Sequence, residues 1–183
     1  MFSFDGELKL LVMKFKTFFA IIGICFFAVA CKSKIAIDYN NMIAEKQKSL
    51  GIAMDEAEPK LRNYFASFEY DSIVNVSNRM EAKIDSIFRE IEKKPAPKAE
   101  QGENFKKAAL NYFDYFKTIY ATYKNYGLQN TPEDRLSAGQ DMTMILSQED
   151  KMIADMLEAQ RIFAKDNNFK IQGAKQNNSL VAK

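Results

Sequence analysis

The sequence predicts an all-α protein, an antiparallel four-helix bundle with up-down-up-down topology that follows an N-terminal export signal. Apolar residues recur every three or four positions through most of the chain, which is the spacing of amphipathic helices. No useful stretch alternates with a period of two. The chain also holds only seven Gly and four Pro among 183 residues, too few for an all-β fold rich in turns.

The N-terminus is organised like a secretory signal peptide. Residues 18–30 carry no charge, and Lys14 and Lys16 precede them. A short basic segment, an apolar stretch of about 7–15 residues and small residues at a cleavage point define such a signal. The apolar stretch is too short for a membrane-spanning helix, which needs about 20 residues. We therefore exclude residues 1–30 from the predicted fold.

The signal is expected to start at Met13 and not at Met1. Residues 1–12 place Asp5 and Glu7 ahead of the basic segment. Acidic residues at that position suit an export signal poorly, because its first part is positively charged.

The cleavage point carries a more specific pattern. Residues 28–31, Ala-Val-Ala-Cys, resemble the lipobox of bacterial lipoproteins, although Ala28 stands where that pattern prefers Leu. The resemblance implies cleavage after Ala30 and lipid on Cys31, with residues 31–37 as a short tether. Several acyl chains on one cysteine anchor a protein stably, because each buried CH₂ contributes about 0.8 kcal/mol. Cys25 competes poorly, since bulky Ile24 precedes it.

The composition of the remaining chain limits what stabilises it and what it binds. Both cysteines, Cys25 and Cys31, lie at or before the cleavage point, so no internal disulfide is expected. Residues 1–30 hold three of the 26 Lys and Arg and two of the 24 Asp and Glu, which leaves a net charge of +1. A nearly neutral domain has no electrostatic basis for binding nucleic acid.

The bundle is predicted over residues 38–169. Its first helix covers residues 39–65, with Asp38 as N-cap, and Pro59 is expected to kink or break it. The second helix covers residues 72–93. Six apolar residues of this helix share one face: Ile73, Val76, Met80, Ile84, Ile87 and Ile91.

The second half begins after a linker over residues 94–102, where two prolines disfavour helix. The third helix covers residues 104–126, and Gly127 is expected as a left-handed C′ residue. The fourth helix opens with Thr131 as N-cap and Pro132 as first residue, and it ends near residue 166. Asn167 and Asn168 are candidate left-handed caps, Phe169 folds back on the last turn, and residues 170–183 form a polar, disordered tail.

Several segments resemble a known family. The quoted residues are Asp38-Tyr39-Asn40, the aromatic run 111–116, and residues 159–165 followed by Asn168-Phe169. They are similar to a family of small helical lipoproteins of Bacteroidetes and spirochaetes, described as surface proteins of unknown function. The resemblance covers most of the chain after residue 30, implies a helical fold and an envelope location, and brings no activity or site. The segment Lys32-Ser33-Lys34 departs from surface lipoproteins of Bacteroidetes, which often carry acidic residues there.

The residue types present argue against catalysis. The chain has no histidine, which removes the commonest general base, His-based triads and nearly all zinc sites. Its glycines are isolated, so no Gly-rich phosphate loop is present. We therefore expect no enzyme, no catalytic residue, no metal site and no cofactor.

The aromatic residues of the third helix are the one candidate binding feature. Tyr112, Tyr115, Tyr120 and Tyr123 lie in an apolar arc about 160° wide, taking 100° per residue. They are interpreted as a possible ligand or partner surface. The alternative interpretation is the bundle core, with the hydroxyl groups reaching its rim.

Three functions follow from these features. The favoured one is a tethered interaction module that binds an envelope protein, a glycan or a host molecule such as a host protein. The alternatives are a passive structural envelope lipoprotein and a helical bundle that binds a small ligand. The expected location is the cell envelope, at the outer membrane, with the side of that membrane left open.

We predict that Cys31→Ala leaves the chain unprocessed and without lipid, because the acylated thiol is gone. Cys25→Ala is the matched control and should be processed normally. Metabolic labelling with a fatty acid and intact-mass measurement check both variants. A lipidated Cys31→Ala chain would contradict the assignment of the cleavage site.

Overall fold

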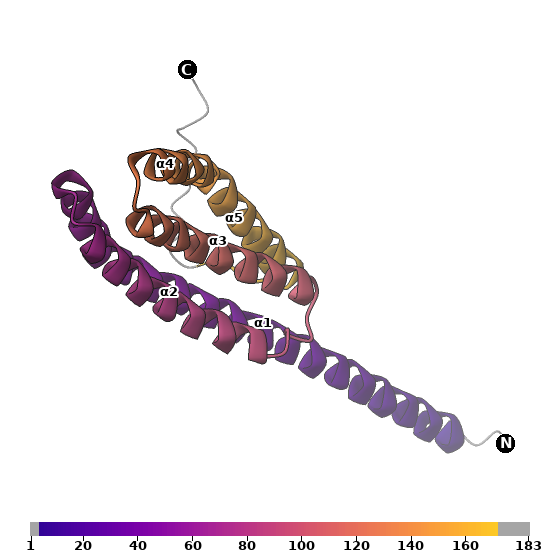
Figure 1. Cartoon of the computed structure of the whole chain (residues 1–183). Helices are drawn as coiled ribbons and strands as arrows, with labels where there is room; N and C mark the ends of the chain where they lie inside the picture. Colours follow the sequence, from indigo (N-terminus) through magenta and orange to yellow (C-terminus); the bar gives the residue numbers. More distant parts are fainter. Residues whose placement is uncertain (1–3, 172–183) are drawn as a thin grey trace.

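The computed structural model describes the backbone of residues 4–171 and the side chains of residues 33–171. This part of the chain is helical and contains no strand. Five helices follow one another (Figure 1): α1 (Phe4–Ser67), α2 (Tyr70–Lys93), α3 (Gly102–Leu128), α4 (Pro132–Leu146) and α5 (Glu149–Asp166). Helices α1, α2 and α3 alternate in direction. Helices α4 and α5 follow one another along the bundle and together take the place of its fourth helix. The predicted all-α, antiparallel bundle is confirmed.

Helix α1 begins far earlier than predicted. The expected start at Tyr39 with Asp38 as N-cap is wrong, because α1 runs unbroken through residues 31–37. Residues 24–50 contain neither Gly nor Pro, so nothing in the sequence ends the helix there. Within that segment, Ala36 is fully buried and already belongs to the bundle core. The side chains of the predicted signal, residues 1–30, and of Cys31 lie outside the described residues.

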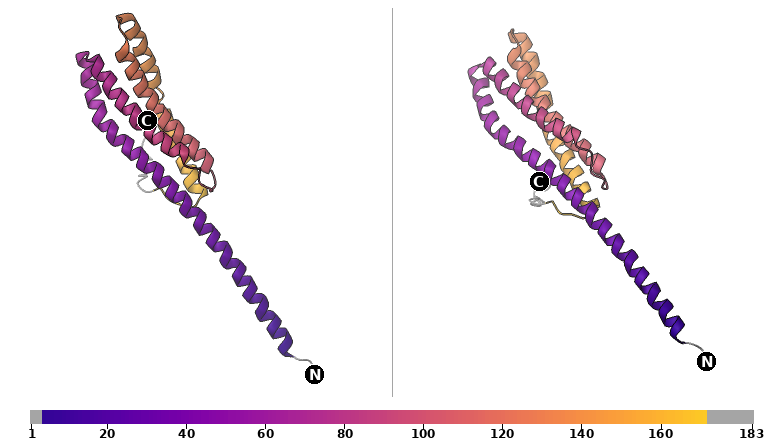
Figure 2. Two further views of the ribbon diagram at one scale, coloured as in Figure 1. Left: turned by 60° about the horizontal axis from the view of Figure 1, so that its bottom comes forward. Right: turned by 90° about the horizontal axis from the view of Figure 1, so that it is seen from below.

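Pro59 was expected to kink or break the first helix, and it does not break α1. The helix continues through it to Ser67. A proline inside a helix removes one backbone hydrogen bond, but Ala57 and Leu61 on either side are buried in the core and hold the helix in place. The part of α1 that packs in the bundle is curved (Figure 2).

The contact between α2 and α3 is the most extensive in the bundle. All six apolar residues of the predicted α2 face are buried, which confirms that face. The buried side of α3 consists mostly of aromatic side chains. One of them, the Phe105 ring, stacks on Phe163 of α5 at 4.7 Å between centroids. Two ion pairs flank the α2–α3 contact, Lys117 with Asp85 at 2.7 Å and Lys124 with Glu81 at 2.6 Å.

Gly127 has a different role from the predicted one. It lies inside α3, which continues to Leu128, and it is not in the left-handed conformation. A Cβ atom at this position would lie 2.8 Å from Val74 Cγ2 and 2.9 Å from the Tyr70 carbonyl oxygen. Glycine is therefore needed here because α3 approaches the first turn of α2 this closely.

The predicted fourth helix is two helices, α4 and α5, so the prediction of one helix up to residue 166 is wrong. Thr131 does cap α4, since its hydroxyl accepts a hydrogen bond from the Asp134 N–H at 3.1 Å, and Pro132 opens the helix as predicted. The helix stops at Leu146. The Ile145 carbonyl oxygen there accepts from the Tyr115 hydroxyl at 2.9 Å and from the Gln148 N–H at 3.1 Å.

Local sequence features at both ends explain where α5 starts and ends. Glu149 and Asp150 open α5, where acidic side chains suit the positive end of the helix dipole. At the other end Asn168 has φ 56°, as predicted, and the Phe169 N–H donates to the Ala164 carbonyl oxygen at 3.0 Å. The Phe169 ring folds back on Phe163. The tail from residue 172 lies outside the described residues.

We predict opposite effects for alanine at two helical glycines. Gly127→Ala should lower the free energy of unfolding by about 1–3 kcal/mol, because the added methyl group meets backbone of α2. Gly51→Ala should raise it by about 0.5–1 kcal/mol, since Gly51 lies in α1 with nothing within 4 Å of its missing side chain. Urea unfolding followed by circular dichroism measures both, and equal effects would contradict the close approach of α3 to α2.

Candidate functional site

The four tyrosines singled out in the sequence belong to the interior of the bundle. Tyr120 is fully buried, Tyr115 and Tyr123 are buried, and Tyr112 is half-buried against the core. Since α3 contacts α2, α4 and α5, its wide aromatic arc is covered on most sides. The three buried rings therefore form bundle core and not an exposed partner surface.

The hydroxyl groups of these tyrosines join the helices. Tyr120 donates a hydrogen bond to Glu58 Oε1 of α1 at 2.7 Å, and Tyr115 donates to the Ile145 carbonyl oxygen where α4 ends. Burial raises the pKa of Tyr120 and of Tyr123 well above its ordinary value, and the negative charge of Glu58 raises both further. The phenols accordingly stay protonated at neutral pH and remain hydrogen-bond donors.

Tyr39 is also buried, in the α1 segment near the start of α3. Its ring packs edge-on to Phe105 at 6.1 Å, while its hydroxyl oxygen has no hydrogen-bond partner among the described atoms. Burial raises the pKa of Tyr39 to about 12, and the charge of Glu103 adds to the shift. A buried hydroxyl without a partner destabilises the fold, because it loses its hydration without replacement.

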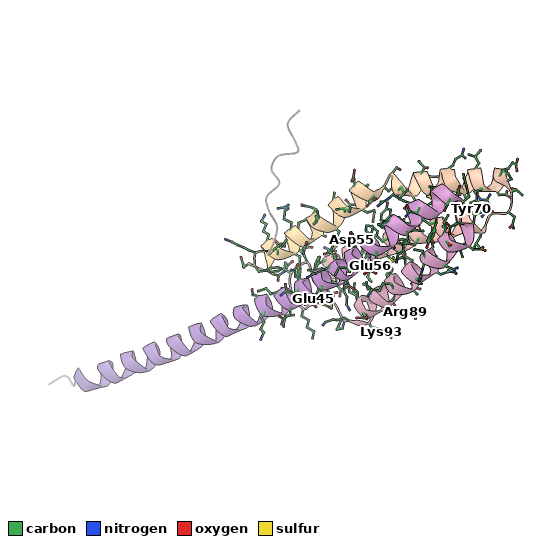
Figure 3. All side chains as sticks on the ribbon, turned by 90° about the vertical axis from the view of Figure 1, so that its left-hand side faces the viewer. Glu45, Asp55, Glu56, Tyr70, Arg89 and Lys93 are labelled. Atoms are coloured by element: carbon green, nitrogen blue, oxygen red, sulfur yellow. The ribbon has the colours of Figure 1, made fainter. Side chains whose placement is uncertain are left out.

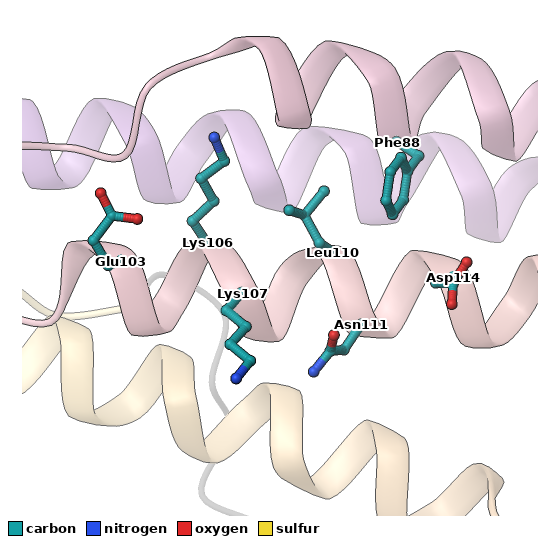
Figure 4. A pocket seen from close by; sticks show the side chains of 7 residues that line it. All are labelled: Phe88, Glu103, Lys106, Lys107, Leu110, Asn111 and Asp114. Carbon is teal, nitrogen blue, oxygen red and sulfur yellow. The ribbon is translucent and has the colours of Figure 1, made fainter.

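A pocket of about 380 Å³ lies between α2 and α3, with Phe88 and Leu110 as its apolar part (Figure 4). Lys106 reaches from it toward the turn after α2, and Lys107 points the other way. The Lys106 ammonium donates to the carbonyl oxygens of Glu92 at 2.9 Å and Lys94 at 2.7 Å. A cation at that position stabilises the last turn of a helix, so the contact has a structural purpose.

Residues 33–171 offer neither a membrane-spanning helix nor a cluster of metal ligands. No helix in this part of the chain is long and apolar enough to cross a bilayer. The same residues contain no group of three or more His, Cys, Asp or Glu side chains placed to hold a metal ion.

A second set of side chains gathers at one end of the bundle, where α1 meets α2 and α3 meets α4. This end lies opposite the N-terminal extension of α1, and Figure 3 labels Tyr70 there. Three large apolar residues at this end are exposed: Phe68 at 68%, Leu136 at 67% and Leu128 at 56%. We call the following group the distal patch: Phe68, Tyr70, Tyr126, Leu128, Arg135 and Leu136.

Phe68 is held in an unfavourable backbone conformation. Its φ is 59°, in the left-handed region, and it ends α1 while the next N–H, of Glu69, donates to the Tyr64 carbonyl oxygen at 2.9 Å. Glycine normally fills such a position, because a side chain there costs about 1–2 kcal/mol. The chain places a large aromatic side chain there and exposes it to solvent.

Arg135 and two tyrosines form the floor beside Phe68. The Arg135 guanidinium lies 3.7 Å from the centroid of the Tyr70 ring, and its Nη2 donates to the Gln129 carbonyl oxygen. Tyr126 packs against Tyr70 at 6.2 Å between centroids. A hollow of about 600 Å³ opens over these side chains, with Leu136 at its wall. These side chains form an aromatic and cationic lining in the hollow.

The sequence interpretation missed the distal patch. One signal for it is visible in retrospect, an aromatic residue at the position after a helix end, where glycine or asparagine is usual.

No family model, no curated protein and no solved structure matches this chain. The described residues form a helical bundle with an exposed phenylalanine, Phe68, beside two half-buried tyrosines at one end.

We predict opposite consequences of removing two buried hydroxyl groups. Tyr120→Phe should lower the free energy of unfolding by about 1–2 kcal/mol, because Glu58 loses the donor that links α3 to α1. Tyr39→Phe should leave it within about 0.5 kcal/mol or raise it, since that hydroxyl has no partner to lose. Thermal and urea unfolding of both variants measure the difference, and a large loss with Tyr39→Phe would contradict the description of that site.

Proposed function

We propose that this protein is a lipid-anchored, non-catalytic interaction module of the cell envelope, and that it binds a partner protein through the distal patch. The observation that carries the proposal is Phe68, which is exposed and held at a positive φ. Phe68 lowers the stability of the fold through its backbone conformation and buries little apolar area in return. Its side chain is therefore better explained by binding than by folding.

The chemistry of the distal patch fits a protein partner. Aromatic residues and arginine are enriched in protein interfaces, and a few of them dominate the binding free energy. Here Phe68, Tyr70 and Arg135 lie together, with the guanidinium already stacked on the tyrosine ring. Because this floor is ordered by contacts within the protein, a partner has little side-chain freedom to remove on binding.

The location in the envelope is part of the proposal. The lipobox pattern that ends at Cys31 supports a lipid anchor, and the resemblance to small helical lipoproteins supports the same location. The distal patch lies at the end of α1 remote from Cys31, so an anchored protein would present it away from the membrane. Cleavage by protease added to intact cells, compared with lysed cells, decides which side of the outer membrane it faces.

A passive structural lipoprotein is the alternative from another class. Such a protein needs no exposed aromatic surface, and the distal patch disfavours it for that reason. A small-ligand-binding bundle has less support, since the lysine of the α2–α3 pocket already caps α2.

We test the proposal by placing a photoreactive amino acid at residue 136 in living cells. Irradiation should give a discrete adduct with a partner protein. The matched control carries the same amino acid at residue 144, where Met144 is exposed at 59% in another part of α4. The same adducts from both positions, or none from residue 136, would reject the proposal.

We predict that Phe68→Gly separates stability from binding. Glycine accepts the left-handed conformation, so the free energy of unfolding should rise by about 1 kcal/mol. The adduct at residue 136 should be lost, because the main aromatic contact is gone. Met144→Gln is the control and should change neither measurement; a stabilised Phe68→Gly protein that still forms the adduct would argue against the distal patch.

A further inference from the structure

The hollow of the distal patch is rich in hydrogen-bond donors. Tyr70, Tyr126, Arg135 and Gln140 supply O–H and N–H groups to it, and no Asp or Glu lines it. Unlike the hydroxyl groups that join α3 to α1 and to α4, those of Tyr70 and Tyr126 are not hydrogen-bonded to another described residue. Arg135 has five N–H donors, and the fold hydrogen-bonds only Nη2. A ligand that matches this lining therefore brings acceptors and few donors.

Two tyrosine rings, set at an angle, form the aromatic part of the hollow. The ring centroids of Tyr70 and Tyr126 lie 6.2 Å apart, and the ring planes make an angle of 55°. Phe65 packs on Tyr126 at 5.3 Å between centroids, and the Arg135 guanidinium packs on Tyr70. Both rings are thus held in place by the fold, and they offer aromatic surface to a compact apolar group.

Gly139 keeps the α4 wall of the hollow open. It lies inside α4, where glycine is less favourable than alanine. A Cβ atom at this position would meet only the Tyr126 ring, at 3.7 Å, which is an ordinary van der Waals distance. The fold therefore has room for a side chain here, and glycine leaves that room to a ligand.

The charges beside the hollow are negative. Four exposed carboxylates lie next to its tyrosine and its arginine in the sequence: Glu69, Asp71, Glu133 and Asp134. Charges within about 8 Å of one another act on each other at physiological salt. These carboxylates disfavour a phosphate-bearing or acidic partner and favour a basic residue beside the ligand.

We propose that the hollow receives a proline-rich segment of the partner protein, in the polyproline II conformation and with a basic residue beside it. The inference rests on the proposed function of the distal patch and names the chemistry of the partner. Proline has a carbonyl group but no N–H, and a polyproline II backbone makes no internal hydrogen bonds, so its carbonyl oxygens are free to accept. Aromatic-lined grooves are a known way to bind such segments.

The dimensions agree with this ligand. The α4 wall from Pro132 to Thr143 is about 16 Å long at 1.5 Å per residue. About five residues in the polyproline II conformation, at 3.1 Å each, cover that length. The volume of about 600 Å³ is also in the usual range of ligand pockets.

The test measures the binding of fluorescein-labelled peptides to the complete chain in detergent, by fluorescence anisotropy. One peptide has ten prolines followed by two lysines, and a second has alternating glycine and serine in place of the prolines. The proline peptide should bind at least about tenfold more tightly, because it is already extended before it binds. A third peptide, with two glutamates in place of the lysines, should bind about threefold more weakly than the first, as expected for exposed charges.

Two variants place the peptide in the hollow. Gly139→Leu should weaken binding of the proline peptide at least about tenfold, because the new side chain fills the hollow. Gly51→Leu is the matched control, since Gly51 lies in α1 with open space around it, and it should bind as the unchanged chain does. Tyr126→Phe keeps the ring and removes one donor, so it should weaken binding about fivefold. Circular dichroism checks that each variant keeps its helices.

The outcomes separate this inference from the proposed function. If residue 136 forms its adduct in cells but the proline and glycine–serine peptides bind equally, the partner has another chemistry and only this inference is overturned. Binding of the proline peptide that is unchanged in Gly139→Leu would also overturn it, since the peptide would then lie elsewhere. The absence of any adduct from residue 136 would reject the proposed function and this inference together.

Discussion

The burial of the isoleucine-rich face of α2 by the aromatic face of α3 is the interaction on which the rest of the bundle depends. Helices α1, α4 and α5 all pack on this pair, which has the largest contact in the molecule. Each fully buried Ile or Phe side chain contributes about 1.5–3 kcal/mol, and residues 33–171 contain no cysteine that could form a disulfide. Stability therefore depends on close helix packing, and Gly127 marks where that packing is tightest.

Polar contacts around this core align the helices more than they stabilise them. The ion pairs of Lys117 with Asp85 and Lys124 with Glu81 are partly exposed, and such pairs contribute at most about 1 kcal/mol. The hydrogen bond from Tyr120 to Glu58 is different, because its donor is fully buried. It ties α1 to α3 near Pro59, where α1 lacks one backbone hydrogen bond.

Periodicity and local capping rules predicted the parts of the fold that local sequence determines. The apolar face of α2, the Thr131 cap and the left-handed Asn168 are examples. The predicted start of α1 at Tyr39 was wrong, because residues 24–50 contain no Gly or Pro that would interrupt a helix. Gly127 and the division after Leu146 depend on neighbouring helices, through Tyr70 and Tyr115, which a single sequence does not place.

The candidate site was harder to predict than the fold. An aromatic arc on α3 indicates an apolar surface but not what covers it, and the neighbouring helices bury most of it. Phe68 lies in the α1–α2 connection and Arg135 in the first turn of α4, and both meet Tyr70 only in the folded bundle. Their grouping is a property of topology, since the α1–α2 and α3–α4 connections share one end of an antiparallel bundle.

The continuity of α1 gives the protein a fixed reach. From residue 31 to Ser67 the helix has 37 residues, about 55 Å at 1.5 Å each. Because the helix passes through residues 31–37 without a break, the distance of the domain from Cys31 and its rotation about the helix axis are set together. One residue inserted between Cys31 and Ala36 would turn the whole domain by about 100° relative to Cys31. With the proposed lipid on Cys31, the same helix would therefore fix both the height of the distal patch above the bilayer and the direction in which it faces.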